Sequence, residues 1–479
     1  MKHSIFLACL FTLIISAQAK ESVKPNIIII LADDLGYGDV QALNPDGKIL
    51  TPCLDSLTAG GMFFRDMHSP SSVCTPTRYG ILTGRYCWRS PLKSGVLYGY
   101  DPPLIEADRP TLPAMLRECG YHTAAVGKWH LGLAWAEKNP REKKGAVPEE
   151  NVDFSRPFAG GPTELGFDYF FGISASLDMP PYVYLENDRV VKLPETRKTW
   201  IREGAAATDF EAEDVLPKIT EKAVAYIDSR AEDAKNGKPF FLYFALTSPH
   251  TPILPTEEWR GKSGLNPYAD FVMQTDAVVG KIMETLAHHG LTENTLLIFA
   301  SDNGCSPQAD FPTLWAKGHD PNAGFRGAKA DIFDGGHRIP FIVRWPGKIR
   351  EGSASDQLGC LTDFMATFAA VTGCPLPNTA EDSVNLLPAM LETADAPLRT
   401  EVVHHSINGS FAIRQGDWKL CLCPDSGGWS APTPGSVAAK NLPPVQLYNM
   451  RTDVAEKENL QGENREKVEE MTRNLESRK

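Results

Sequence analysis

The sequence predicts an α/β fold: a large, mixed but mostly parallel sheet between helices, and a small antiparallel sheet near the C-terminus. Three observations predict it. Apolar runs alternate with amphipathic segments of helical period along most of the chain, as in a parallel sheet that is covered on both faces. Polar residues follow several of the apolar runs directly. After about residue 390, short strand-like segments replace this alternation.

The first strand candidate covers residues 26–31 and contains four consecutive isoleucines followed by a leucine, which is typical of a strand buried on both faces. A helix is expected after Thr51-Pro52, because proline suits the first turn, and Gly60-Gly61 should end it. The apolar residues of 111–119 fall on one helical face, and Gly120 follows as a C-terminal stop. Residues 121–126 then predict the next strand.

The alternation continues in the second half of the chain. Strands are expected over residues 239–246, 296–300 and 340–343, and a helix over residues 276–289. The segments 411–414 and 418–422 predict an antiparallel pair, and the charged tail after Arg465 predicts a terminal helix. These elements divide the chain into three parts: a signal peptide (1–19), a catalytic domain (20–390) and a C-terminal subdomain (391–479).

The N-terminus has the three parts of a secretory signal. Lys2 and His3 precede an apolar run over residues 5–15, and Ala17-Gln18-Ala19 forms a small-x-small cleavage site. The run is too short to span a bilayer, and no later stretch is long and apolar enough to anchor the mature chain. We therefore expect an exported protein, periplasmic or extracellular, with no membrane association after cleavage.

Charge and cysteine content limit the possible functions. The 479 residues carry a formal net charge of −12, and no run of basic residues interleaved with aromatics stands out, so nucleic-acid binding is not expected. Of the ten cysteines, eight remain when Cys9 and Cys74 are set aside. Disulfides are permitted in an oxidising compartment, but the spacing does not determine their pairing.

Chemically versatile side chains follow the predicted strands at their carboxyl ends, where ligands of parallel sheets bind. They comprise Asp33-Asp34, Lys128-Trp129-His130, His250 and Asp302-Asn303. Together these positions offer four hard oxygen ligands, from Asp33, Asp34, Asp302 and Asn303. Such ligands suit Ca²⁺ or Mg²⁺ and exclude a thiolate-type zinc site. The histidines are acid or base candidates because imidazole titrates near neutral pH.

The segment Cys74-Thr75-Pro76-Thr77-Arg78, followed by Leu82-Thr83-Gly84-Arg85, is the most specific local pattern. Pro76 suits the first turn of a helix, so Cys74 is expected at the helix N-terminus, where the dipole favours negative charge. Arg78 returns to the same face one turn later. A capped helix with a buried cysteine remains the alternative interpretation of these residues alone.

With this pattern the sequence resembles the type I sulfatase family, in whose Cys-x-Pro-x-Arg signature the cysteine is oxidised to formylglycine. Thr77 departs from the pattern, since serine or alanine is commoner there. The resemblance is closest to the arylsulfatase A and N-acetylgalactosamine-6-sulfatase group, especially bacterial carbohydrate sulfatases. It implies an alkaline-phosphatase-like sandwich and a formylglycine-generating maturation enzyme as a partner.

Further motifs extend the resemblance along the chain. They are Pro25 to Gly36, Gly127 to Gly132, Ser301 to Gly304, Arg326 to Lys329 and Gly335 to Pro340. In the last region Asp334 and His337 replace commoner residues. The family pattern implies one cation, Ca²⁺ with Mg²⁺ as the alternative, held by Asp33, Asp34, Asp302, Asn303 and the modified Cys74.

The resemblance also implies the remaining roles. Lys128, Lys329 and Arg78 supply positive charge to the sulfuryl group. His250, or alternatively Lys329, protonates the departing oxygen, and His130 removes a proton from the formylglycine hydrate so that sulfate leaves. The expected substrates are sulfated carbohydrates of galactose or N-acetylgalactosamine type. Specificity is expected in the loops 176–184 and 310–325 and around Trp429. Tyr182, Tyr184 and Trp429 are candidates to stack on a sugar, and packing within the fold is an equal alternative for them.

Two other functions stay open at this point. One is a phosphonate or phosphodiester hydrolase of the alkaline phosphatase superfamily, which the Lys128-Trp129-His130 segment and the one-cation ligand count disfavour. The other is a catalytically silent, glycan-binding relative, which predicts that Cys74 is unmodified.

Overall fold

The computed structural model describes residues 24–142 and 145–479, so the predicted signal peptide lies outside the described residues. A ten-stranded sheet crosses the larger part of the molecule in the order β13-β2-β12-β11-β1-β10-β4-β5-β6-β7. Its centre is parallel: β11 (Thr295–Ser301), β1 (Asn26–Ala32), β10 (Phe240–Ala245), β4 (His122–Lys128) and β5 (Tyr169–Ile173). Antiparallel pairings flank this centre, which confirms the predicted mixed, mostly parallel α/β sheet.

The outer strands of this sheet are short. On one side of the parallel centre lie β12 (Phe341–Arg344), β2 (Met62–Phe64) and β13 (Ser353–Ser355). On the other lie β6 (Leu185–Glu186) and β7 (Arg189–Val190). Two small sheets accompany them: β3 (Met67–His68) with β14 (Gly359–Cys360), and the hairpin β8 (Thr196–Trp200) with β9 (Arg202–Ala206).

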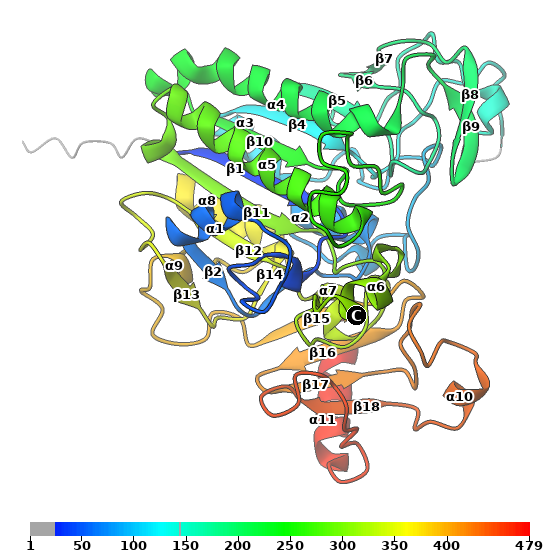
Figure 1. The fold of residues 1–479 in the computed structure, drawn as a ribbon, viewed down its shortest axis with the longest axis vertical. Helices are drawn as coiled ribbons and strands as arrows, with labels where there is room; N and C mark the ends of the chain where they lie inside the picture. Colours follow the sequence, from blue (N-terminus) through cyan, green and yellow to red (C-terminus); the bar gives the residue numbers. More distant parts are fainter. Residues whose placement is uncertain (1–23, 143–144) are drawn as a thin grey trace, which may run out of the picture.

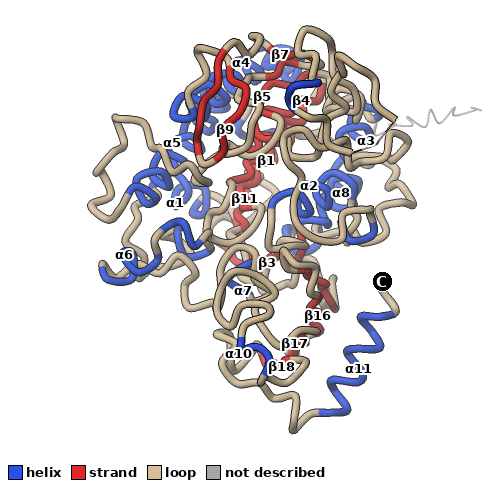
Figure 2. Tube along the Cα trace, turned by 90° about the vertical axis from the view of Figure 1, so that its right-hand side faces the viewer, coloured by secondary structure: helices blue, strands red, loops and turns tan. Residues whose placement is uncertain are grey.

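Helices cover both faces of the large sheet, as Figure 2 shows with the sheet nearly edge-on. On one face lie α1 (Pro52–Ala59), α4 (Ala212–Lys235) and α5 (Pro267–His288). On the other lie α2 (Cys74–Thr83), α3 (Leu112–Glu118) and α8 (Phe364–Thr372). The side chains of β1 and β10 are fully buried between these layers, as their continuous apolar sequences predict.

Helix boundaries differ from the sequence prediction in two places. Helix α5 begins at Pro267, not at residue 276, because the Asn266 side chain accepts a hydrogen bond from the Ala269 backbone and caps the helix nine residues earlier. Helix α4 was not predicted, although its buried positions Val215, Ile219 and Ala223 recur at helical spacing. The expected helix over 111–119 is α3, which Thr111 caps through Ala114.

A four-stranded antiparallel sheet forms a separate lobe below the large sheet (Figure 1). Its order is β15 (Glu401–His405), β16 (Phe411–Gln415), β17 (Trp418–Cys421) and β18 (Gln446–Asn449). Helix α11 (Arg465–Glu476) packs on β16 and β17 through Met471 and Leu475. Short helices complete the fold: α6 (Phe311–Ala316), α7 (Asp334–His337), α9 (Leu387–Met390) and α10 (Val437–Lys440).

One disulfide joins distant parts of the chain. Cys119, after α3, is bonded to Cys374, after α8, with 6.0 Å between the Cα atoms. The other cysteines of the described residues are unpaired, namely Cys53, Cys74, Cys87, Cys305, Cys360, Cys421 and Cys423. Among the described residues, no helix has both the length and the apolar composition needed to span a bilayer.

Candidate active site

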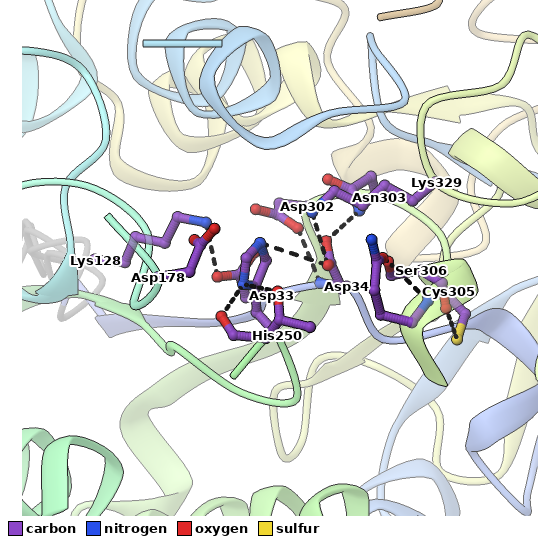
Figure 3. Close-up of polar contacts among 12 residues, drawn as sticks. Asp33, Asp34, Lys128, Asp178, His250, Asp302, Asn303, Cys305, Ser306 and Lys329 are labelled. Carbon is purple, nitrogen blue, oxygen red and sulfur yellow. Dashed lines mark hydrogen bonds and ion pairs between the residues drawn. The ribbon is translucent and has the colours of Figure 1, made fainter. Parts of the chain in front are cut away.

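The predicted site residues come together at the carboxyl edge of the parallel strands (Figure 3). Asp33-Asp34 follow β1, Asp302-Asn303 follow β11, and Lys128 is the last residue of β4. His250 lies in the loop after β10, which pairs with β1 on one side and β4 on the other. The pairing of β1 with β10 continues past the strand ends, because the Asp33 amide donates a hydrogen bond to the Ser248 carbonyl at 2.9 Å.

Three ion pairs balance the buried charges of this edge. Each ammonium or guanidinium nitrogen lies 2.7 Å from its carboxylate oxygen: Lys128 Nζ with Asp33 Oδ2, Lys329 Nζ with Asp34 Oδ2, and Arg78 Nη2 with Asp302 Oδ2. All six side chains are almost completely removed from solvent. Pairing of this kind is required, since an unpaired buried charge is very costly.

Not every oxygen of the cluster is used by these pairs. Asp33 Oδ1 and Asn303 Oδ1 are buried and have no hydrogen-bond partner in the described chain. The Asn303 amide nitrogen donates to Asp34 Oδ1 at 2.8 Å, which fixes the orientation of its amide group. Ligand atoms of Asp33, Cys74 and Asp302 lie within 4.8 Å of one another, as do those of Asp33, Asp34 and His250. This donor set fits one hard divalent cation.

The pKa values of the carboxylates support the same conclusion. Burial raises the pKa of Asp302, and the nearby negative charge of Asp33 raises it further, against the opposing charges of Arg78 and Lys128. Burial also acts against ionisation of Asp33, but Lys128, His250 and Arg78 together hold its pKa well below the usual range. Two carboxylates crowded in this way gain from a positive ion placed between them.

Cys74 is the first residue of α2 and is 2% exposed, as the Cys-x-Pro-x-Arg spacing predicts. Burial raises the pKa of its thiol, although Lys128 and Lys329 act in the opposite direction. Arg78, one turn later, donates to Asp302 and, at 3.0 Å, to the Lys128 carbonyl. Its guanidinium therefore links Asp302, the residue directly after β11, to the backbone at the end of β4, and its charge is paired with Asp302.

The two histidines are held differently. His130 Nε2 donates to the Leu97 carbonyl at 2.7 Å, which leaves Nδ1 as a buried, unpartnered lone pair. Burial, with Lys128 and Arg78 nearby, keeps the pKa of His130 well below its usual value. His250 Nδ1 lies 2.5 Å from the Thr251 carbonyl, and its Nε2 lies 3.6 Å from Asp34 Oδ2. Burial and the charge of Lys329 lower the pKa of His250.

Sequence reasoning missed the contribution of β5, an aromatic-rich strand of five residues. The loop after it runs beside the β4 end, since the His130 amide donates to the Ser174 carbonyl at 3.0 Å. Residues 176–184 of this loop were expected to determine specificity, but the motifs did not single out Asp178 within them. For Tyr182 the sequence left two roles open, stacking on a sugar or packing in the interior; it is 1% exposed and lies edge-on against Trp200, so it packs.

The fold and the site define a class of protein: an α/β protein whose mostly parallel sheet carries a candidate cation site of carboxylate and amide oxygens, beside a cysteine at a helix N-terminus. The family model for sulfatases matches residues 25–374. The N-acetylgalactosamine-6-O-sulfatase of Bacteroides thetaiotaomicron is 34% identical, over 96% of this chain and 94% of its own length. Human arylsulfatase A is 32% identical, over 91% of this chain and 83% of its own.

A solved structure shows the same relationship. It is described under the metabolism of multiple glycosaminoglycans by Bacteroides thetaiotaomicron, and it superposes with a TM-score of 0.80 at 33% identity. The match covers 95% of this chain and 99% of that one. The chain belongs to the sulfatase family, and it is a sulfuric ester hydrolase. Members of the family generally use a metal ion and a formylglycine.

Proposed function

We propose that this sulfatase removes sulfate from carbohydrates of galactose or N-acetylgalactosamine type, using a formylglycine made from Cys74 and one divalent cation. One observation carries the proposal: Cys74 lies within ligand distance of Asp33 and Asp302 at an edge that Lys128 and Lys329 also reach. The substrate class rests on relatives named as N-acetylgalactosamine-6-sulfatases, from the bacterium at 34% identity and from mouse at 30%.

The cation would be held by Asp33, Asp34, Asp302 and Asn303, with residue 74 adjacent. Ca²⁺ is the expected ion, because it accepts several carboxylate oxygens in flexible geometry, whereas Mg²⁺ requires a near-ideal octahedron and retains water. When bound, the ion supplies a Lewis acid that polarises the sulfate ester and favours ionisation of a neighbouring hydroxyl. Asp33 Oδ1 and Asn303 Oδ1 supply the oxygens that the protein leaves unpaired.

The remaining chemistry falls to the side chains of this chain. The hydrated aldehyde of formylglycine offers one hydroxyl to attack sulfur and a second whose proton is lost when sulfate is released. Lys128 and Lys329 neutralise the sulfate oxygens, and Arg78 holds Asp302 and the end of β4 in position. Two lysines are needed to attract the sulfate group, because the carboxylates of Asp33, Asp34 and Asp302 at the same edge offset part of their positive charge.

Proton transfers are assigned to the two histidines. His250 donates a proton to the departing alcohol oxygen; the lowered pKa makes its protonated imidazole a stronger acid, and Asp34, 3.6 Å from Nε2, opposes the lowering and stabilises that protonated form. Lys329 is the alternative donor. His130 accepts a proton at Nδ1, since its other nitrogen is engaged by Leu97. The low pKa of His130 keeps it neutral and therefore competent as a base.

The first test measures residue 74 and sulfate release together. After expression with a formylglycine-generating enzyme, peptide mass spectrometry is expected to show loss of the thiol and an aldehyde-reactive residue 74. The Cys74→Ser variant has only one hydroxyl, so it should take up one sulfuryl group and retain it, visible as a stable adduct in the intact mass. Sustained turnover by this variant, or an unmodified Cys74 in active wild-type protein, would contradict the mechanism.

The second test compares substrates. Wild-type protein is expected to release sulfate from N-acetylgalactosamine 6-sulfate and from an aryl sulfate, and to act poorly on the matching aryl phosphate. A preference for the phosphate would support the alternative phosphohydrolase. Activity confined to glucosamine or steroid sulfates would contradict the galacto-type substrate.

We also infer that the chain is exported to the periplasm or beyond, with cleavage after Ala19. The Cys119–Cys374 disulfide supports an oxidising compartment. N-terminal sequencing of protein from the exported fraction should begin at Lys20. The proposed division at residues 390/391 is supported by the start of the antiparallel sheet at Glu401, and limited proteolysis near residue 390 tests it.

A further inference from the structure

Asp178 is a buried acid with one oxygen unaccounted for. Its side chain is 8% exposed, and one carboxylate oxygen, Oδ2, is paired with the Arg202 guanidinium. The other oxygen, Oδ1, is buried and has no hydrogen-bond partner in the described chain. A buried carboxylate oxygen without a donor is unfavourable, and it gains free energy from any hydroxyl that reaches it.

Its position relates it to the reaction centre. Asp178 lies in the loop after β5, four residues beyond Ser174, whose carbonyl accepts from the His130 amide at 3.0 Å. One residue earlier, the Ile173 carbonyl accepts from the Trp129 amide at 3.1 Å. Figure 3 shows the Asp178 carboxylate at the Lys128 end of the active-site cluster. The mechanism above gives Asp178 no role.

Arg202 and Tyr98 extend this group toward solvent. The Arg202 side chain is 40% exposed, and its guanidinium carbon lies 5.5 Å from the centroid of the Tyr98 ring. Tyr98 is 51% exposed and directly follows Leu97, the residue that holds His130. The hairpin that carries Arg202 is attached to the Asp178 loop, since the Tyr182 amide donates to the Ala205 carbonyl at 2.8 Å.

The charges select the chemistry of the ligand. An isolated carboxylate would repel an anionic sulfate ester, but Arg202 neutralises Asp178 while leaving Oδ1 able to accept a hydrogen bond. Hydroxyl groups are the matching donors, and an exposed tyrosine ring offers a face to an apolar sugar surface. A carbohydrate carries both features, whereas an aryl sulfate carries no sugar hydroxyl.

We propose that Asp178, Arg202 and Tyr98 form the recognition site for the hydroxyl groups of the sugar that carries the scissile sulfate. This inference rests on the proposed function, because it assigns the sugar-binding part of the same site. Asp178 accepts a sugar hydroxyl through Oδ1, Arg202 holds the carboxylate in place, and Tyr98 contacts the ring. These residues therefore determine which sulfated compounds bind. They take no part in breaking the sulfate ester bond, which occurs at the carboxyl edge of the parallel strands.

The test is a substrate comparison with the Asp178→Asn variant, which keeps the side-chain size. Loss of a hydrogen bond to a charged group costs about 1.5–3 kcal/mol, or roughly 10- to 150-fold. We expect kcat/KM on N-acetylgalactosamine 6-sulfate to fall by that factor, and kcat/KM on an aryl sulfate to change less than about 3-fold. Equal losses on both substrates, or no loss on the sugar, would overturn the inference.

Two further variants guard against a folding defect in the first. Tyr98→Ala changes an exposed ring and should lower only the sugar activity. Arg189→Gln, a matched surface arginine paired with Asp188, should leave both activities unchanged. Binding of the sulfated sugar to Cys74→Ala protein, measured by calorimetry, should weaken when Asp178→Asn is added. Wild-type protein that releases sulfate from neither ester would overturn the proposed function, and this inference with it.

Discussion

Two buried charged clusters can be compared in this molecule. The catalytic-edge cluster comprises Asp33, Asp34, Arg78, Lys128, Asp302, Asn303 and Lys329. The junction cluster lies where α7 and β3 meet the C-terminal sheet. It comprises the buried residues His68, Asp334, His337, His404, Lys419 and Glu456, with the partly exposed Asp66 at its rim. Each cluster contains a group of side chains whose ligand atoms lie close enough together for a metal ion.

The junction cluster contains a continuous chain of hydrogen bonds. His68 Nε2 lies 2.8 Å from Asp66, and His68 Nδ1 lies 3.0 Å from His337 Nδ1. His337 Nε2 lies 3.2 Å from Lys419 Nζ, which also contacts Asp334 and Glu456, each at 2.7 Å. These contacts are satisfied when Lys419 donates to His337 Nε2, His337 Nδ1 donates to His68, and His68 Nε2 donates to Asp66. His404 lies outside this chain, and its Nε2 has no hydrogen-bond partner among the described residues.

Ring orientation distinguishes the clusters further. The His337 and His404 rings are stacked, with centroids 3.7 Å apart and planes inclined by 11°. Lone pairs lie in the ring planes, so two nearly parallel rings direct them along separate planes and cannot both reach one ion. Within the described residues, unpaired buried atoms occur in both clusters: His404 Nε2 at the junction, and Asp33 Oδ1 and Asn303 Oδ1 after two neighbouring parallel strands at the catalytic edge. Burial of charge alone does not identify a site; unpaired ligand atoms that converge do.

The largest expected effect tests this distinction directly. The Asp302→Ala variant should no longer bind the cation, and its kcat should fall by at least about 10³-fold. The reason is that a Lewis acid supplies several kcal/mol of transition-state stabilisation. His404→Ala should retain both cation content and kcat. Inductively coupled plasma mass spectrometry of both variants, beside sulfate release, gives the comparison. A metal ion lost from the His404 variant would contradict the structural interpretation of the junction cluster.

The second effect is on stability. Lys419→Met removes the ammonium group between Asp334 and Glu456. Asp334 keeps its pair with Arg338, but Glu456 is left as a buried carboxylate without a cationic partner in the described chain. Breaking a buried pair in this way costs about 3–5 kcal/mol of unfolding free energy. Urea denaturation should show this loss, while kcat per folded molecule stays near the wild-type value. The exposed pair of Lys479 with Glu476 is the control, and Lys479→Met should change stability by less than about 1 kcal/mol.

The catalytic edge was more predictable than the junction, for a physical reason. The central strands have apolar sequences long enough to recognise, and parallel strands bring the residues after Ala32, Lys128 and Ser301 to one edge. The spacing placed Arg78 on the same helical face as Cys74. It could not show that the Arg78 guanidinium pairs with Asp302, because Asp302 lies 224 residues away in the chain.

The junction cluster left no periodic pattern in the sequence. His68 and His404 belong to short strands far apart in the chain, and only the docking of the C-terminal sheet brings them together. Asp334 and His337 appeared only as departures from the family pattern. The structure gives them partners: Lys419 contacts both, and His337 also contacts His68. Polar contacts between separate sheets depend on tertiary packing, which local sequence does not encode.

The smallest effect concerns pH and belongs to the junction cluster. Burial, with the charges of His68 and Lys419, holds the pKa of His404 well below the usual value of a histidine. The folded protein keeps His404 neutral, whereas the unfolded chain takes up a proton below about pH 6.5, so the unfolded state binds more protons. Stability from this group is therefore complete above pH 6.5 and falls as the pH is lowered.

His404→Phe should remove this contribution and flatten the pH dependence of the unfolding free energy. Below pH 6.5 the slope should decrease by up to about 1.4 kcal/mol per pH unit, the value for one proton. Above pH 7.5 the slopes of wild type and variant should coincide, which separates proton linkage from a simple packing defect. Urea titrations at a series of pH values measure both regions. Parallel curves over the whole range would mean that His404 is not held neutral by its surroundings, and that the junction is less tightly closed than the hydrogen-bond chain indicates.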